Sequence, residues 1–336
     1  MPENLFVRAP GKLVLLGEYA VVEGYPALVA AVDRYAALHT DPSGPPGQII
    51  AVTGQPEAVQ LQWKKQGWHA TKKAWKLSAM ALTAAFGEQA PAVVVDTSPF
   101  YLKREKKPPL KAGFGSSAAV TAVMLAAGPQ ASLEPEVLLR QAREVHQAAH
   151  ASLGSGIDLA AAVYGGVLAY QLGKRTPRIT PLALPPGVHV GVFWSGRSAS
   201  TSRMLEAVLQ WKTLAPAAHA KLMRRMGALS RRGIAAFAAG DAAKFLSAAQ
   251  AYGEIMAELG QAAGTPIFSS PWRRVAAQLS PVAVVKPSGA GGGDVFLALC
   301  HAEDKTKMRE AGRALGLQWL EVELGAPGLE RREIVE

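Results

Sequence analysis

Residues 110–120 read "LKAGFGSSAAV": two glycines flank a phenylalanine, and two serines open an alanine-rich run. A glycine-rich turn before a helix lets backbone N–H groups surround an anion, and the helix dipole adds partial positive charge at that end. Ser116 and Ser117 add hydroxyl groups that can reach a phosphate or a magnesium ion. We therefore predict a phosphate-binding loop at residues 113–117, with Ser116 as the N-cap of a helix that stops at Gly128 and Pro129.

Other phosphate-binding loops fit this stretch less well. The Walker pattern fails because Gly11 and Lys12 are followed by leucine, and the protein-kinase loop fails because alanine occupies the position of its third glycine. The dinucleotide fingerprint G-x-G-x-x-A is satisfied, with Glu134 about twenty residues further on. That fingerprint must follow a buried apolar strand, whereas "YLKREKKPPLKA" precedes it here. A nicotinamide enzyme is therefore a disfavoured alternative.

Two further glycine-containing stretches lie far from the first. Residues 9–28, "APGKLVLLGEYAVVEGYPAL", place Lys12 and Glu18 around a special turn, and residues 286–295, "KPSGAGGGDV", form a glycine cluster between two apolar strands. Glycine permits positive φ and close packing of backbone, which a binding loop needs. Three such segments in one chain favour a single elaborate site over an isolated structural turn.

Composition and charge limit the class of protein. The chain has 336 residues, 49% hydrophobic and 18% charged, which suits about two globular domains. We expect a cytoplasmic protein, because no run approaches the roughly 20 apolar residues of a membrane span, the N-terminus lacks a signal peptide, and Cys300 is the one cysteine. The net charge of +10 suits anionic partners, but no zinc-finger or RNA-binding pattern occurs, so no nucleic acid and no membrane partner is expected.

The order of predicted elements indicates an α+β protein. Residues 4–22 are expected to form two strands around a turn at Pro10 and Gly11, and helices are expected at 72–87, 116–129 and 134–154, with a charged loop at 101–112. After the proline-rich segment 183–187 come a strand at 188–194, long helices at about 201–263, two strands, a helix and a last strand at 317–324. That second half follows a ferredoxin-like split βαβ pattern.

The three glycine segments together resemble the GHMP kinases, the family of galactose, homoserine, mevalonate and phosphomevalonate kinases. Residues 9–33, 113–123 and 286–299 match the three family motifs in order and spacing over nearly the whole chain. The resemblance implies a two-domain GHMP kinase fold. Residues 1–185 would form a ribosomal protein S5 domain 2-like, ATP-binding N-terminal domain, and residues 186–336 a ferredoxin-like C-terminal domain with helical elaboration.

Within the family, the sequence most resembles the phosphomevalonate kinases. Tyr19 and Asp294 stand where mevalonate kinases usually carry histidine and glycine, and residues 154–166 and 195–202 look like phosphomevalonate kinase segments. Two departures are evident. The family sequence A-H-x-x-A-Q-G-K ends here in His150, Ala151 and Ser152, so a lysine is missing. Gln147 occupies the position of the magnesium-binding glutamate of mevalonate kinases.

The resemblance implies ATP- and Mg²⁺-dependent phosphorylation of (R)-5-phosphomevalonate to (R)-5-diphosphomevalonate, in the mevalonate pathway of isoprenoid biosynthesis. Mevalonate kinase or another GHMP small-molecule kinase remains an alternative, as does a catalytically inert GHMP-fold ligand-binding protein. The expected partners are the small molecules ATP and 5-phosphomevalonate. The sequence leaves open whether the protein is a monomer or a homodimer.

The resemblance also implies roles for individual residues. Lys12 and Asp158 would be catalytic, with Asp158 acting either as a base or by positioning Lys12. Because a phosphate acceptor has a second pKa near ~6 and needs no deprotonation at neutral pH, positioning is the expected role. Ser116 and Ser117 would bind the metal. The ATP-binding residues would be Gly113, Phe114, Gly115, Ser116, Ser117 and Ala118. The substrate-binding residues would be Lys12, Tyr19, His146, Ser155, Arg197, Ser288, Gly289, Ala290 and Gly291.

Overall fold

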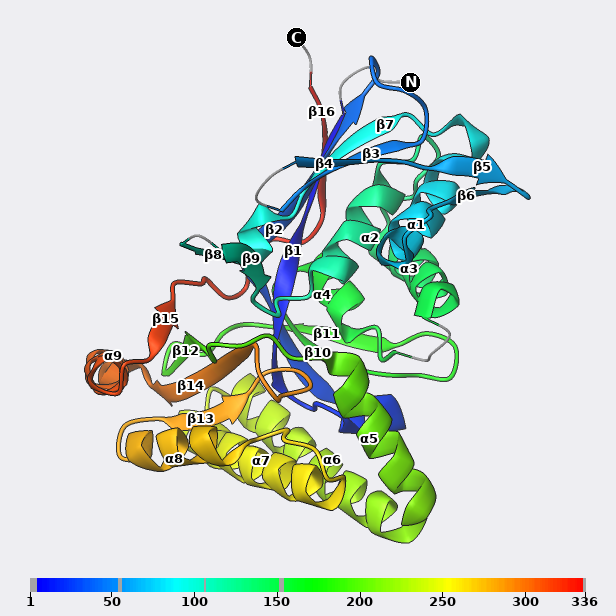
Figure 1. Cartoon of the computed structure of the whole chain (residues 1–336). Coiled ribbons are helices and arrows are strands. Elements are labelled where there is room, and N and C mark those ends of the chain that lie inside the picture. Colours follow the sequence, from blue (N-terminus) through cyan, green and yellow to red (C-terminus); the bar gives the residue numbers. More distant parts are fainter. Residues whose placement is uncertain (1–4, 54–55, 106, 151–153, 335–336) are drawn as a thin grey trace. The chain divides into compact units, whose positions relative to one another are not determined.

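The computed structural model describes residues 5–53, 56–105, 107–150 and 154–334, and it combines helices with sheets, as the sequence predicts (Figure 1). The chain divides into two compact units that are interleaved along the sequence. Unit 1 comprises Met1–Lys12, Ala31–Gly166 and Glu323–Glu336, and unit 2 comprises Leu13–Ala30 and Val167–Val322. The boundary expected between residues 185 and 186 stays a prediction.

Two long strands, β1 (Leu5–Leu16) and β2 (Ala27–Asp41), each contribute residues to both units. The other strands of unit 1 are β3 (Gln48–Val52), β4 (Pro56–Gln60), β5 (Gln62–Lys64), β6 (Gly67–His69), β7 (Ala92–Asp96), β8 (Tyr101–Arg104), β9 (Lys107–Lys111) and β16 (Glu330–Glu333). Its helices are η2 (Lys73–Trp75), α1 (Lys76–Phe86), η3 (Gly87–Gln89), η4 (Ser98–Phe100), α2 (Ser116–Ala126), α3 (Pro135–His150) and α4 (Ile157–Tyr164).

In unit 1, β7 is hydrogen-bonded antiparallel to the second half of β2 and parallel to β3, which in turn pairs with β4. Helix α2 packs against α1, α3 and α4. Nine of its eleven residues are buried, and most of them are small, so three helices can approach it closely. Residues 113–117, which we call the phosphate loop after their predicted role, therefore precede the central helix of unit 1.

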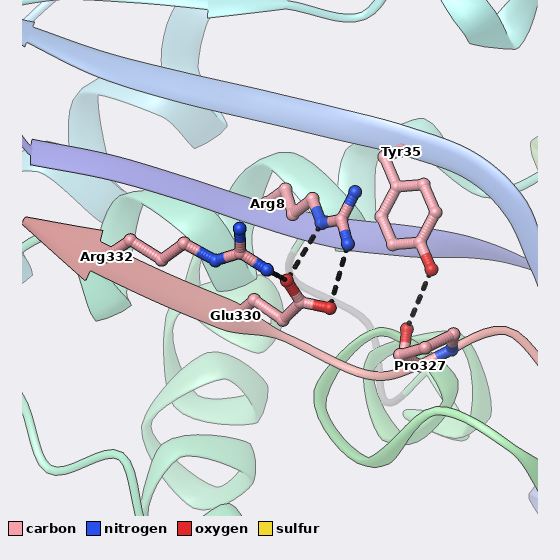
Figure 2. A network of polar contacts seen from close by, with 5 residues as sticks. All are labelled: Arg8, Tyr35, Pro327, Glu330 and Arg332. Carbon is pink, nitrogen blue, oxygen red and sulfur yellow. Dashed lines mark hydrogen bonds and ion pairs between the residues drawn. The ribbon is translucent and has the colours of Figure 1, made fainter. Parts of the chain in front are cut away.

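The C-terminal strand β16 closes unit 1 by pairing antiparallel with β1 (Figure 2). Arg8 Nε and Nη2 donate to the two carboxylate oxygens of Glu330 at 3.1 and 2.9 Å, and the guanidinium carbon lies 4.6 Å from the ring centre of Tyr35. Arg332 donates to the same carboxylate at 2.8 Å, and the Tyr35 hydroxyl donates to the Pro327 carbonyl at 3.3 Å. The Arg8–Glu330 and Tyr35–Pro327 contacts join segments that lie 322 and 292 residues apart in the sequence.

Unit 2 contains the strands β10 (Val167–Gln171), β11 (Arg178–Leu182), β12 (Val188–Trp194), β13 (Val284–Pro287), β14 (Val295–His301) and β15 (Gln318–Leu320). Its helices are η1 (Ala20–Glu23), α5 (Thr201–Leu214), α6 (Pro216–Ala238), α7 (Ala242–Ala262), α8 (Ser270–Leu279), η5 (Ala302–Asp304) and α9 (Lys305–Ala314). None of the helices in the described part of the chain is both long enough and apolar enough to span a membrane.

Four strands of unit 2 form an antiparallel sheet in the order β13-β14-β12-β15. In chain order this is second, third, first, fourth, which is the strand order of a split βαβ fold, so the sequence prediction is confirmed. A core cluster that includes Phe193, Phe296, Cys300 and Met308 packs on this sheet. Cys300 lies in β14 and is buried.

Three local predictions were wrong. Pro10 and Gly11 do not form a turn, because β1 continues through them. A Cβ at Gly11 would lie 2.7 Å from the carbonyl oxygen of Phe114, so this glycine allows the phosphate loop to lie against the strand. The charged segment after residue 100 forms the hairpin β8–β9 rather than a loop. The N-cap of α2 is Gly115, and Ser116 is the first helical residue.

Candidate active site

The predicted phosphate loop leads directly into α2. Gly113 and Gly115 have φ values of 90° and 81°, in the left-handed region that glycine adopts without steric cost. The backbone N–H of Lys12 donates to the Phe114 carbonyl at 2.8 Å, and the Phe114 side chain is buried. The loop is therefore held against β1 by backbone contact, with the phenylalanine as its anchor in the core.

The N-terminus of α2 has the properties of an anion site. The first N–H groups of a helix have no intrahelical partner, and the structure shows no side-chain cap at Gly115. Ser116 and Ser117 occupy the first two helical positions, and Ala118 N–H already donates to the Gly115 carbonyl at 3.1 Å. Together with the helix dipole, this arrangement favours a phosphate group at the end of α2.

Lys12 places a cation at the same loop. A Cβ built on Gly115 would lie 3.2 Å from Cγ and 3.3 Å from Cε of Lys12, so the lysine stem runs along the glycine backbone. Lys12 Nζ lies 3.4 Å from the Gly113 carbonyl oxygen, to which it donates. The pairing of Lys12 with residues 113–117 was predicted from the sequence, and unit 1 brings these residues together.

Asp158 lies in the first turn of α4, which packs against α2. The helix follows Gly156, whose φ is 73°, and Asp158 Oδ1 accepts a hydrogen bond from Leu159 N–H at 3.0 Å. The carboxylate is half-buried. Both of the segments that the sequence singled out in unit 1 therefore have the same design: a left-handed glycine followed by an uncapped helix start.

Helix α3 contributes a residue that sequence reasoning missed. A Cβ on Gly156 would lie 3.1 Å from Arg143 Nε, so this half-buried arginine rests on the glycine two residues before Asp158. Nothing in the sequence distinguishes it from other arginines on the helix. His146 lies on the same helix and is half-buried, and Ser155 Oγ accepts from Ile157 N–H at 3.4 Å. Residues 151–153, where the family lysine is missing, lie outside the described residues.

In unit 2, the turn after β1 is bonded to the loop after β13. Tyr19 has a φ of 63°, unusual for a tyrosine, and its hydroxyl donates to the Ala290 carbonyl at 2.5 Å. Ser288 Oγ accepts from Val14 N–H at 2.9 Å and donates to the Val14 carbonyl at 3.1 Å. We call residues 288–294, the loop after β13, the glycine loop. The hydroxyl groups of Tyr19 and Ser288 hold this loop on the N-terminal segment.

A buried ion pair lies at the base of these two segments. Lys286 Nζ contacts Glu18 Oε1 at 2.5 Å and donates to the Pro287 carbonyl at 2.7 Å, and the two side chains are 0% and 2% exposed. Tyr252 packs beside the ammonium and donates its hydroxyl to the Glu18 carbonyl at 2.8 Å. Burial raises the pKa of Glu18, and the Lys286 charge opposes that rise. The sequence singled out Glu18 beside a special turn but did not indicate that it pairs with Lys286.

The far end of the glycine loop meets the segment of residues 195–199, which we call the arginine loop. Asp294 Oδ1 accepts from Ala199 N–H at 3.1 Å and from Ser198 Oγ at 3.2 Å. The side chain of Arg197 is exposed. The sequence marked Asp294 as a difference from mevalonate kinases but did not indicate that it contacts this loop.

Comparison with known proteins identifies the family. Residues 72–166 match the GHMP kinases N terminal domain. The chain is 30% identical to the mevalonate kinase of Aeropyrum pernix over 87% of both chains. The chain belongs to the GHMP kinase family. It is also 29% identical to the phosphomevalonate kinase of Streptomyces sp. strain CL190, over 92% of this chain and 94% of the relative.

A solved GHMP kinase shares the fold along almost the whole chain. Streptococcus pneumoniae phosphomevalonate kinase in complex with phosphomevalonate and AMPPNP superimposes with a TM-score of 0.79, covering 95% of this chain and 99% of that one at 20% identity. The GHMP kinase fold expected from the three motifs is therefore confirmed. The roles of the individual site residues in this GHMP kinase stay predictions.

Proposed function

We propose that this GHMP kinase transfers the γ-phosphoryl group of ATP to (R)-5-phosphomevalonate and forms (R)-5-diphosphomevalonate. The observation that carries the proposal is the uncapped N-terminus of α2 with Lys12 lying along Gly115, in a chain that aligns with a phosphomevalonate kinase over almost its full length. The helix end would hold the ATP phosphates through the backbone of residues 113–118 and the hydroxyl groups of Ser116 and Ser117.

Phosphoryl transfer requires positioning and charge stabilisation more than covalent help from the protein. Two charge sources are available at the loop: the α2 dipole and the Lys12 ammonium. The dipole acts on the ATP phosphates, and the lysine, near the Gly113 carbonyl, neutralises charge between donor and acceptor. The net charge of +10 would attract both polyanionic substrates.

Magnesium would accompany ATP, and the residues near α2 are suited to it. Mg²⁺ prefers oxygen ligands and commonly uses substrate phosphates with one or two protein groups. Ser116 and Ser117 offer hydroxyl oxygens at the helix start, and no cluster of three His, Cys, Asp or Glu side chains exists within the described residues that could hold a metal without the nucleotide. When bound, the ion would neutralise phosphate charge.

Asp158 would position Lys12 rather than act as a base. The acceptor phosphate is largely dianionic at neutral pH, because its second pKa is near ~6, and it can attack without losing a proton. Asp158 Oδ1 already accepts a hydrogen bond within its own helix turn, which fixes the carboxylate direction. The proposed role is to orient Lys12.

Arg197 is the basic side chain of unit 2 proposed to contact the acceptor. Arg197 suits a phosphate or carboxylate through paired hydrogen bonds. The other proposed contacts are Lys12, Tyr19, His146, Ser155, Ser288, Gly289, Ala290 and Gly291. Phosphorylation of mevalonate itself is the second candidate function, because a mevalonate kinase is 30% identical to this chain.

The test is Mg²⁺-dependent ADP release with 5-phosphomevalonate and with mevalonate at equal concentration. We expect a higher kcat/KM with the phosphate ester. A Lys12→Met variant should lose at least about a hundredfold in kcat, while Lys103→Met, at an exposed lysine of β8 in the same unit, should not change it. A higher kcat/KM with mevalonate would mean that mevalonate, not 5-phosphomevalonate, is the acceptor. ATP binding without turnover of either substrate would favour an inert GHMP-fold protein.

A further inference from the structure

Asp294 makes an unusually dense set of contacts with the arginine loop. Besides the two hydrogen bonds to its carboxylate, its backbone N–H donates to the Arg197 carbonyl at 2.9 Å, and its carbonyl accepts from Ser195 N–H at 2.8 Å. Ser195 Oγ also donates to the Arg197 carbonyl at 2.7 Å. The backbone on both sides of Arg197 is therefore bonded to one residue of the glycine loop.

The conformation at Asp294 suits these contacts and few other residue types. Its φ is 54°, in the left-handed region that aspartate and asparagine tolerate better than most residues. The two loops are also in backbone contact, because a Cβ on Gly293 would lie 2.9 Å from the Arg197 carbonyl oxygen and 3.0 Å from Ala199 N. A short side chain at position 294 thus reaches the arginine loop without displacing it.

The side chain of Arg197 has no hydrogen bond, ion pair or ring contact with any other described residue. An exposed arginine on a mobile backbone would lose conformational freedom when it binds an anion, which weakens binding. On a backbone held at both ends, less freedom is lost. Oδ1 of Asp294 accepts its two hydrogen bonds from the arginine loop, so the favourable contribution of this residue is made through the loop.

We propose that Asp294 is a positioning residue that holds the arginine loop so that Arg197 meets the anionic group of the acceptor. The inference rests on the proposed function and extends it, because it assigns acceptor affinity and the preference for a phosphate ester to a residue that does not touch the substrate. The proposed role involves no contact with ATP, so the expected effect is on the acceptor alone.

The first experiment measures steady-state kinetics of Asp294→Ala and Asp294→Asn. The alanine variant should raise KM for 5-phosphomevalonate about tenfold, corresponding to 1.4 kcal/mol, with KM for ATP changed less than about twofold. Asparagine keeps an acceptor oxygen and tolerates the same φ, so it should restore most of the affinity. The matched control is Asp41→Ala, because Asp41 Oδ1 accepts from Ser43 N–H and Gly44 N–H in a turn of unit 1. It should leave both KM values unchanged.

A double-variant cycle tests whether Asp294 acts through Arg197. If it does, Asp294→Ala combined with Arg197→Ala should have the same acceptor KM as Arg197→Ala alone. Without the Arg197 side chain, the position of the arginine loop no longer affects acceptor binding. The inference would be overturned if the two substitutions raised the acceptor KM independently, so that their free-energy effects add in the double variant.

A second measurement does not depend on substrate. Trypsin cleaves after arginine, so native-state cleavage at Arg197 reports how firmly the loop is held. Asp294→Ala should speed this cleavage about tenfold and Asp294→Asn much less, with cleavage at the exposed Arg175 as the internal control. Unchanged cleavage at Arg197, or faster cleavage at both sites, would overturn the loop-holding role.

The outcomes separate the two proposals. If the wild type prefers mevalonate, the proposed acceptor is wrong, and the same cycle is measured with mevalonate, whose carboxylate then meets Arg197. Non-additive variants with selective cleavage would support the positioning role for that acceptor, and additive variants would overturn it. If neither substrate is turned over, the proposed function fails, and the cleavage experiment alone decides whether Asp294 holds the loop.

Discussion

Replacing Lys286 by methionine would leave the carboxylate of Glu18 buried without its cation. The two side chains are 0% and 2% exposed, and the lysine also donates to the Pro287 carbonyl at 2.7 Å. Methionine has nearly the same length and fills the space of the lysine stem. The substitution therefore removes the charge and its hydrogen bonds and leaves the packing largely intact.

The expected loss in the free energy of unfolding is about 3–5 kcal/mol, the usual cost of removing one partner of a buried pair. That is a large part of the about 5–15 kcal/mol that stabilises a typical domain. The double variant Glu18→Gln with Lys286→Met removes both charges and should be more stable than Lys286→Met alone. In contrast, Lys307→Met breaks an ion pair to Asp304 on the surface, where the lysine side chain is 70% exposed. This control should leave the stability almost unchanged, because solvent screens an exposed ion pair.

The loss should depend on pH. Without the ammonium, burial remains the largest influence on Glu18 and raises its pKa above the unfolded value of about 4.3, although backbone hydrogen bonds oppose the rise. The folded variant then binds more protons than the unfolded chain, so its stability falls as pH rises through this range. The difference from wild type should be smaller at pH 5 than at pH 8.

Urea unfolding followed by tryptophan fluorescence measures these differences at both pH values. A loss in the free energy of unfolding below about 1 kcal/mol at pH 8 would refute the reasoning, since an uncompensated buried carboxylate destabilises the folded state by more than that. So would a loss that grows as pH falls, because protonation of Glu18 should relieve it.

Three further predictions concern unit 1. Gly115→Ala should raise KM for ATP and cost about 1–2 kcal/mol of stability, because alanine is strained at φ 81° and would displace the Lys12 stem; nucleotide titration and thermal unfolding check this. Asp158→Asn should lower kcat about a hundredfold with an unchanged pH–rate profile, whereas a rate that rises with pH only in the variant would restore the base mechanism. Glu330→Gln should cost no more than about 1 kcal/mol at pH 7, because Arg8 holds the pKa of Glu330 below its usual value. That cost should vanish as pH falls below about 4, which pH-dependent urea unfolding measures.

Much of the architecture could be predicted from local patterns. Alternating and helical periodicities marked β12, α1, α2 and the helices α5–α7, and the order of elements in the second half indicated the split βαβ sheet. The error at Pro10 and Gly11 has a tertiary cause. Pro10 and Gly11 look like a turn in isolation, yet Gly11 is needed for the close approach of the Phe114 carbonyl, a contact across about a hundred residues that no local pattern contains.

The residues of the candidate site also fall into two groups, those recognisable from a local sequence pattern and those whose contacts depend on tertiary packing. Residues 113–117 were predicted from the sequence because a phosphate needs glycine backbone and hydroxyl groups, which occur there in one short run. Lys12 and Asp158 were predicted from the resemblance to the family motifs, and their roles stay predictions. The ion pair of Glu18 with Lys286, the contact of Arg143 with Gly156 and the bonds of Asp294 to the arginine loop were not found. Each joins single residues from separate segments, and such pairings depend on which segments pack together.

By itself, the sequence determined the family, the class of chemistry and the helix start that suits a phosphate. The family and the class of chemistry follow from the resemblance of three short segments to the family motifs, and the helix start follows from the local pattern of residues 113–117. Only the tertiary structure decided which polar groups are already occupied by the protein. Burial forces each of them to take a partner, and the partners of Tyr19, Ser288 and Asp294 lie about 100–270 residues away.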